Sequence, residues 1–153
     1  MKQLNKKRLV YLDYSATTPL DAGVLRAMHK AASSFGNPSS IHAFGRIARR
    51  YIEDARQICR ASINAQLPTE IIFTSGGTEA NNLALQGVLR ATKVAHPHVI
   101  TTSIEHKSVL DVLHYLEKSG IIELTLLNMD KYGLIDKYDI EKHIQDNTVL
   151  VSS

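Results

Sequence analysis

The chain has 153 residues, of which 44% are hydrophobic and 22% charged, and its formal net charge is +3 at pH 7. This length and apolar content suffice for one domain with a buried core, and the mild, scattered positive charge does not indicate a nucleic-acid-binding protein. No apolar run approaches the roughly 20 residues that cross a bilayer. Because the single Cys59 excludes an intrachain disulfide and is typical of a reducing compartment, we expect a cytoplasmic protein without a membrane partner.

The first part of the chain predicts two helices. Residues 2–8 are basic but lack interleaved aromatic residues and a following apolar stretch, so we expect a solvated terminus rather than a signal peptide or a nucleic-acid arm. Asp21 introduces a helix over 22–34, and the turn-forming residues at 35–40 predict an ordered loop. A second helix over 42–63 carries apolar residues at three- and four-residue spacing, which predicts a buried stripe. Cys59 lies on that stripe, so we expect it to pack rather than to act as a nucleophile.

From residue 70 onward, short β-rich runs alternate with helical stretches. We predict strands over 71–74, 99–102, 122–127 and 149–151, and helices over 79–92, 107–118 and 136–145. This alternation is typical of an α/β protein whose mainly parallel sheet is covered by helices. We therefore divide the chain into an amino-terminal segment with two helices, 1–68, and the first part of a sheet domain, 69–153.

The most informative segment is the turn Gly76-Gly77-Thr78-Glu79, which joins the predicted strand 71–74 to a helix. The N–H groups at a helix start have no intrahelical partner and favour negative charge, and glycines let a ligand approach the backbone. The turn is therefore a candidate phosphate site. The alternative is an ordinary turn with a threonine cap. No lysine follows the glycines as it would in a nucleotide-binding P-loop.

His106 follows the predicted strand 99–102, near the start of the next helix. At the carboxyl end of a strand, an imidazole could stack on a ring or act as an acid or base. The alternative is a surface histidine in a first helical turn. We interpret His96-Pro97-His98 as a loop, since no cysteine or acidic residue accompanies it at ligand spacing, and we expect no metal site.

Four segments together give the chain a specific resemblance. In order and spacing they are similar to the amino-terminal part of a cysteine desulfurase of the NifS/IscS-like branch of the class V aminotransferase family, and the similarity runs along essentially the whole chain. The segments are Tyr11-Leu12-Asp13-Tyr14-Ser15-Ala16-Thr17-Thr18-Pro19, Gly36-Asn37-Pro38-Ser39-Ser40-Ile41-His42 with Gly45-Arg46, Ile72-Phe73-Thr74-Ser75-Gly76-Gly77-Thr78-Glu79-Ala80-Asn81-Asn82-Leu83-Ala84, and Glu105-His106-Lys107-Ser108-Val109-Leu110-Asp111.

The resemblance implies a fold-type-I enzyme that uses pyridoxal 5'-phosphate and works as a homodimer. Such enzymes take sulfur from L-cysteine, release L-alanine and hold the sulfur as a persulfide for an iron–sulfur scaffold or another sulfur-acceptor protein, or for tRNA thiolation. By position, Gly77 and Thr78 would hold the cofactor phosphate, and His106 would stack on its ring and move protons. Segments 16–19 and 37–42 would border the mouth of the active site.

Several parts of the family's machinery have no counterpart in these 153 residues. The lysine that binds the cofactor, the aspartate facing its ring nitrogen, a ring-side asparagine and the persulfide cysteine lie further along the family sequence, and Cys59 does not match that cysteine. We therefore expect an incomplete chain that is inactive alone: a truncated or proteolytic piece, half of a split enzyme, or the product of a decayed gene. The strand 149–151 would then be an unpaired edge that promotes association.

Two rival functions remain. A selenocysteine lyase of the same family would share the phosphate turn and the histidine. A non-catalytic fragment would keep only a binding or dimerisation surface.

Overall fold

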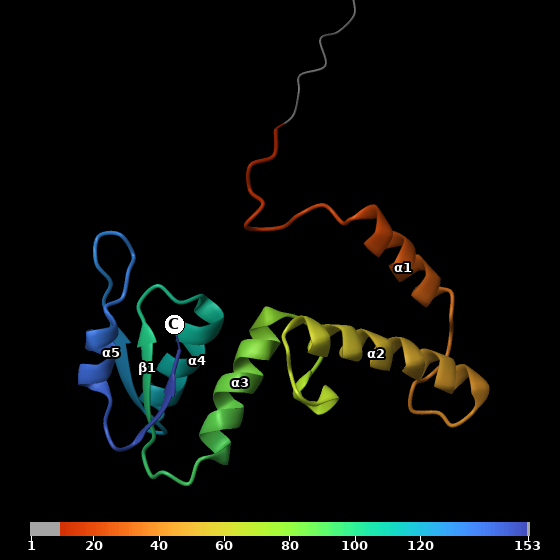
Figure 1. The fold of residues 1–153 in the computed structure, drawn as a ribbon. Coiled ribbons are helices and arrows are strands. Elements are labelled where there is room, and N and C mark those ends of the chain that lie inside the picture. Colours follow the sequence, from red (N-terminus) through yellow and green to blue (C-terminus); the bar gives the residue numbers. More distant parts are fainter. Residues whose placement is uncertain (1–9, 153) are drawn as a thin grey trace, which may run out of the picture. The chain divides into compact units, whose positions relative to one another are not determined.

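The computed structural model describes residues 10–152, so the basic start at residues 2–8 lies outside the described part. It contains five α-helices, one short 3-10 helix and three strands within that range (Figure 1). The chain divides between Ile72 and Phe73 into two compact units. Each unit is described by itself below.

The first unit contains helices α1 (Ala22–Ala32) and α2 (Ala43–Ser62) and the 3-10 helix η1 (Pro68–Glu70). Asp21 caps α1, as its position predicts, by accepting hydrogen bonds from the N–H groups of Gly23 and Val24. The α2 cap is less usual: His42 Nδ1 accepts from the N–H of Gly45 at 3.3 Å. Both helices lie within two residues of their predicted bounds.

The loop between α1 and α2 packs its backbone directly against the first turn of α2. A Cβ placed on Gly45 would lie 2.3 Å from the carbonyl oxygen of Ser40 and 2.7 Å from that of Asn37. A Cβ on Gly36 would lie 2.5 Å from the carbonyl oxygen of Phe44. Because only hydrogen atoms fit in these spaces, the two glycines permit the close approach of loop and helix.

The predicted burial of the apolar stripe on α2 is wrong within this unit. Gly45 is the only buried residue of the helix, and Cys59 is exposed. Phe44 and Ile58, two large apolar residues of the stripe, are 53% and 69% exposed. The spacing of apolar residues predicts the helix and its apolar face correctly, but burial also needs a second surface, and within its unit α2 contacts mainly the short η1.

The second unit is an α/β fold, as predicted. Its elements in chain order are α3 (Gly77–Ala91), β1 (His98–Thr102), α4 (Lys107–Lys118), β2 (Glu123–Leu127), α5 (Lys137–His143) and β3 (Thr148–Val151). The three strands form a parallel sheet in the order β2-β1-β3. A bulge between His98 and Val99 shifts the register of β1 against β3.

The two crossovers place helices on opposite faces of this sheet. Connections between parallel strands are right-handed, and the chain moves from β1 to β2 and then back past β1 to β3. The helices α4 and α5 of these two connections therefore lie on opposite sides of β1 (Figure 1). This arrangement makes β1 the central strand, and all five of its residues are buried.

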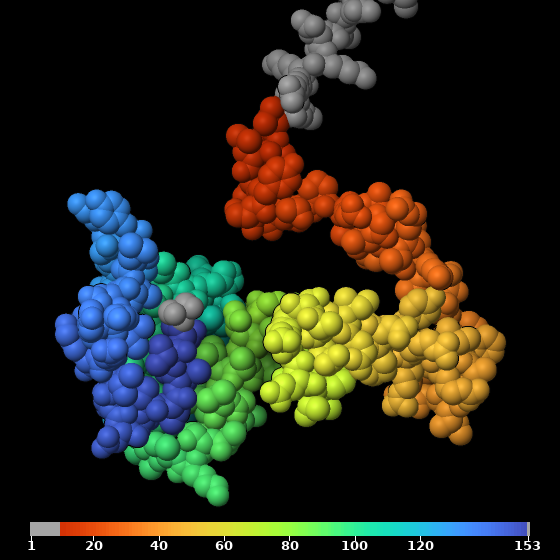
Figure 2. Space-filling model, viewed as in Figure 1, coloured from red at the N-terminus to blue at the C-terminus, as the bar shows by residue number. Residues whose placement is uncertain are grey.

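The core lies between β1 and the helices α3 and α4. Alternate residues of a strand point to opposite faces, and Val99 belongs to the face that packs against Leu85 of α3 and Leu113 of α4. Leu150 of β3 packs against the same cluster, and in Figure 2 the blue atoms of this strand lie against the green atoms of α3. The core thus joins the helix that begins at the glycine turn to the sheet.

His98 joins all three strands at the amino end of β1. Its ring is 1% exposed, with Nδ1 2.8 Å from Thr148 Oγ1 on β3 and Nε2 2.9 Å from Thr125 Oγ1 on β2. Burial lowers the pKa of His98, as does the neighbouring His143, whereas Glu123 opposes the shift. The prediction of a loop for His96-Pro97-His98 is therefore wrong at His98, which begins a buried strand.

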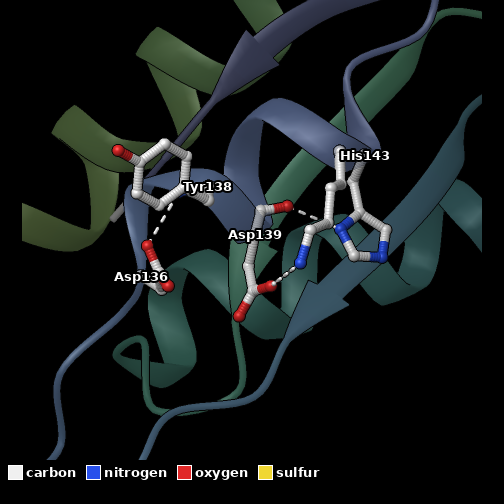
Figure 3. A network of polar contacts seen from close by, with 5 residues as sticks. Asp136, Tyr138, Asp139 and His143 are labelled. Atoms are coloured by element: carbon white, nitrogen blue, oxygen red, sulfur yellow. Dashed lines mark hydrogen bonds and ion pairs between the residues drawn. The ribbon is translucent and has the colours of Figure 1, made fainter.

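The short helix α5 is held by local polar contacts, which Figure 3 shows. Asp136 caps it by accepting from the N–H of Tyr138 at 2.9 Å. Asp139 pairs with Lys142 at 3.2 Å, and its carbonyl oxygen lies 2.6 Å from His143 Nδ1. These contacts stabilise an exposed seven-residue helix that has no buried residue.

The predicted strand at 71–74 does not form. Ile71 has the extended backbone of a strand, but the sheet within residues 10–152 contains β1, β2 and β3 only. β-rich residues favour an extended backbone, yet a strand also needs a hydrogen-bonding neighbour. No helix in residues 10–152 is long and apolar enough to cross a membrane.

Candidate functional site

The start of α3 differs from the other α-helices of the described chain. The side chains of Asp21, His42, His106 and Asp136 cap α1, α2, α4 and α5, whereas α3 has no side-chain cap. Thr78 is the second residue of α3, so the threonine cap considered as the alternative is not formed. The first N–H groups of a helix have no intrahelical partner. Those of Gly77 and Thr78 are therefore free to receive an anion.

Space is also open at this turn. A Cβ on Gly76 or on Gly77 would meet no atom within 4 Å, and both residues and Thr78 are exposed. Open space beside unpaired N–H groups and a threonine hydroxyl is what a phosphate needs. The residues present therefore fit the phosphate of pyridoxal 5'-phosphate.

Glu79 fastens the turn from inside the helix. Its Oε2 accepts hydrogen bonds from the N–H of Ser75 at 2.7 Å and from the Ser75 hydroxyl at 2.5 Å. The Ser75 hydroxyl, and after it the Ser75 N–H, hold the pKa of the Glu79 carboxyl below its ordinary value. The ionised carboxylate thus fixes Ser75, the residue before the glycines, against the first turn of α3.

His106 is the N-cap of α4. Its Nδ1 accepts a hydrogen bond from the N–H of Ser108 at 3.1 Å and lies 2.8 Å from the Ser108 hydroxyl oxygen. A nitrogen that accepts from a backbone N–H cannot itself carry a proton, so the proton of the neutral ring is on Nε2. The ring is exposed. Nε2 is therefore the ring atom that remains available to a ligand.

A hydrogen bond links the helix that begins at the glycine turn to Ser108, the residue that contacts the histidine ring. Asn81, three residues after Thr78 on α3, donates through Nδ2 to the hydroxyl oxygen of Ser108 at 2.8 Å. Helices α3 and α4 pack against each other around this contact. The structure thus brings the two predicted site segments together on one side of the same unit. The motif places Asn81 and Ser108 near the site residues, but sequence reasoning did not identify the bond between them.

Small polar residues lie at the carboxyl ends of β1 and β3, and one of their side chains is unusual. Thr101 of β1 is fully buried, and its hydroxyl has no hydrogen-bond partner within residues 10–152. It shares the face of Val99, toward α3 and α4, because the two are two residues apart on a strand. An unpaired buried hydroxyl costs stability, and functional sites are where such groups are often found.

A cavity of about 390 Å³ lies between α3 and β3. Its walls are mainly apolar, with Leu85, Val109 and Leu150 among them, and its polar groups include Asn81 and Ser152. None of Gly77, Thr78 and His106 lines it. We therefore do not assign it to the cofactor. Within residues 10–152, no group of three or more His, Cys, Asp or Glu side chains could hold a metal ion.

The second unit combines an open parallel sheet, a helix that begins at glycines without a side-chain cap, and an imidazole at the start of the next helix. These features are typical of α/β proteins that bind phosphorylated ligands beside the ends of their strands. Comparison with protein families is more specific. The family model for aminotransferase class-V matches residues 10–153. The chain belongs to the class-V aminotransferase family.

Curated relatives and solved structures agree with this assignment. The chain is 49% identical over 147 residues to the cysteine desulfurase IscS of Dictyoglomus turgidum, a match that covers 95% of this chain and 37% of that protein. Among solved structures, it superposes on a NifS-like protein with a TM-score of 0.87 at 35% identity, covering 93% of this chain and 39% of the other. SspA in complex with cysteine gives a TM-score of 0.84 at 40% identity, with 92% and 40% covered.

These matches confirm the predicted family and the fold-type-I architecture. The chain spans about two fifths of the length of the relatives that it matches.

Proposed function

We propose that this chain is the cofactor-binding part of a pyridoxal-phosphate-dependent cysteine desulfurase. The observation that carries the proposal is the uncapped start of α3, where Gly77 and Thr78 offer N–H groups into open space. Support comes from the desulfurase relatives and from the similar SspA, whose structure is in complex with cysteine. The proposed substrate is L-cysteine, and the products are L-alanine and persulfide sulfur.

Each residue of the site has a defined task in this proposal. The N–H groups of Gly77 and Thr78 and the Thr78 hydroxyl hold the cofactor phosphate. His106 presents Nε2–H to the ligand, since its Nδ1 is occupied by Ser108, and it holds or transfers a proton at that atom. When bound, the pyridine ring serves as an electron sink for the α-carbon of the amino acid.

The remaining features of the proposal rest on the family. The sulfur would pass to an iron–sulfur scaffold or another sulfur-acceptor protein, and the whole enzyme would be a homodimer. The cytoplasm remains the expected compartment because the chain has a single cysteine and no predicted disulfide.

Proline at position 77 tests the phosphate site directly. Proline is favoured as the first residue of a helix and has no N–H, and the extended backbone of Gly76 suits a following proline. Gly77→Pro should therefore leave α3 intact and weaken cofactor binding. Gly77→Ala is the matched control, since it keeps the N–H and its Cβ meets nothing within 4 Å.

The measurement is a titration of the protein with pyridoxal 5'-phosphate. Binding is detected by the circular dichroism signal that a chiral site induces in the absorption band of the cofactor. A hydrogen bond to a charged group contributes about 1.5–3 kcal/mol, so we expect Gly77→Pro and Thr78→Val each to weaken binding by about ten- to a hundredfold. Pyridoxal without phosphate should bind far more weakly. Equal binding of the two compounds, or no effect of either substitution, would overturn the proposal.

A further inference from the structure

We propose that Asn81 and Ser108 are positioning residues, which hold the His106 ring in one orientation with its proton on Nε2 through a directional hydrogen-bond chain from α3 to α4. The catalytic meaning of this chain rests on the proposed function. Its existence and direction do not, because they follow from the hydrogen bonds among these three residues, including the backbone N–H of Ser108.

The first step is the state of His106 Nδ1. The backbone N–H of Ser108 points at this atom at 3.1 Å, and a backbone N–H can only donate. If Nδ1 carried a proton, two N–H groups would face each other. Nδ1 is therefore an acceptor, and this requirement extends to its second neighbour, the Ser108 hydroxyl at 2.8 Å, which must donate its proton to the ring.

The second step is the direction of the bond between Ser108 and Asn81. A hydroxyl has one proton, and that of Ser108 is directed to the ring. Its oxygen must then accept from its other partner, as it does from Asn81 Nδ2 at 2.8 Å. The chain runs from Asn81 to Ser108 to His106, and an amide is the group that can start it.

The third step is burial. Ser108 is 9% exposed and Asn81 is half-buried, although the ring of His106 is exposed. Water therefore cannot readily replace the hydroxyl or the amide, and the ring is held from its buried side while Nε2 faces outward. Because Asn81 lies on the helix that begins at Gly77, the chain connects the orientation of the ring to the helix that offers the phosphate site.

Replacing the amide with a carboxylate should reverse the chain. Asn81→Asp supplies an acceptor only, so the Ser108 hydroxyl proton turns to position 81 and leaves an oxygen lone pair facing Nδ1. The matched control is Asn82→Asp, which makes the same chemical change one residue away, where the amide donates to the Thr78 carbonyl and not to Ser108. Ser108→Ala removes the hydroxyl, and Ser108→Thr restores it.

The readout is the tautomer of His106, measured from ¹⁵N–¹H correlations of histidine-labelled protein without cofactor at pH 8.5, with His106→Gln to assign the signal. We expect the Nε2–H pattern in the wild type, in Asn82→Asp and in Ser108→Thr. In Asn81→Asp and Ser108→Ala, the ring loses its shorter contact, the 2.8 Å hydrogen bond from the Ser108 hydroxyl, and can turn away from the Ser108 N–H at 3.1 Å. The Nδ1 signal should then shift toward the average of the two tautomers. A wild type that already shows the average, or an unchanged signal in both of these variants, would overturn the proposal.

This experiment is independent of the cofactor titration. A protein that shows the expected tautomer pattern but binds no pyridoxal 5'-phosphate would refute the proposed function and leave the hydrogen-bond chain established. A protein that binds the cofactor but lacks the pattern would refute the chain alone.

Discussion

His98 is the clearest case in which one side chain explains a property of the whole sheet. Its ring is buried and contacts hydroxyls on both neighbouring strands, so the neutral form is held in place. Neither Thr125 nor Thr148 could be identified as its partner from the sequence, because strand order and register bring together residues 27 and 50 positions apart. Without that register, the sequence His96-Pro97-His98 indicates a loop, because nothing in it shows that His98 has partners on two strands.

We expect the stability of the protein to fall in acid because of His98. Its pKa is lowered in the folded state, so between the unfolded value of about 6.5 and the lower folded value the unfolded chain binds more protons. The contribution of neutral His98 is therefore fully present above pH 6.5 and is lost as the pH falls through that window.

Urea unfolding at pH 8 and pH 5 checks this expectation. The wild type should lose more free energy of unfolding between the two pH values than His98→Asn, with a slope that cannot exceed about 1.4 kcal/mol per pH unit for one proton. Equal losses in the two proteins would show that other groups cause the acid sensitivity.

At the scale of the element, the helices contain glycines of two kinds: one in a crowded position and one beside open space. Gly45 on α2 is surrounded by backbone carbonyls, whereas Gly87 in the middle of α3 has no atom within 4 Å of a Cβ. Both lie inside helices, so helix propensity alone would favour alanine equally at each. The difference arises because the loop before α2 packs its backbone against the first helical turn at Gly45, whereas the space beside Gly87 is open.

Alanine at the two positions should therefore have opposite effects. Gly45→Ala forces a methyl group against the Ser40 carbonyl, and overpacking of this kind costs about 1–3 kcal/mol. Gly87→Ala should stabilise α3 by up to about 1 kcal/mol. Urea unfolding followed by circular dichroism measures both. A Gly45→Ala protein as stable as the wild type would mean that the loop moves away without cost.

The elements also show which sequence patterns were sufficient. Five helices and three strands are predicted near their observed bounds because each has its own residue periodicity and turn-forming flanks, and some have a capping residue, as Asp21 shows for α1. The predictions that failed depend on a partner elsewhere. Within residues 10–152, segment 71–74 does not join the sheet of β1, β2 and β3, and the apolar stripe containing Cys59 is exposed in its unit. The Asn81–Ser108 hydrogen bond could not be predicted from the sequence for the same reason, since it forms only where α3 packs on α4.

For the whole molecule, the two units differ in how their helices and strands are stabilised. In the second unit, the strand β1 is buried along its length between two neighbours. In the first unit, α1 has no buried residue and α2 has only Gly45. An isolated helix as short as α1, with 11 residues, is marginal without tertiary packing.

Hydrogen exchange should reveal this difference directly. We expect the amides of β1 to exchange most slowly and those of α1 to exchange near their intrinsic rates, because protection follows burial and packing. Mass spectrometry of peptides from the exchanged protein measures both regions in one experiment. Protection of α1 equal to that of β1 would contradict the expectation.

The two ends of the sheet differ in what their residues do: those at the amino end stabilise the fold, and those at the carboxyl end lead to the candidate site. Its amino end is joined by His98 and the two threonines that bond it, and its carboxyl end leads to the exposed turn of His106. A library of random variants should therefore divide by position. Substitutions at the amino end that abolish ligand binding would also lower the yield of folded protein. Substitutions at the carboxyl turns that abolish ligand binding would leave that yield unchanged. Redesign of ligand preference can therefore concentrate on the carboxyl turns, provided that the amino end is kept as it is.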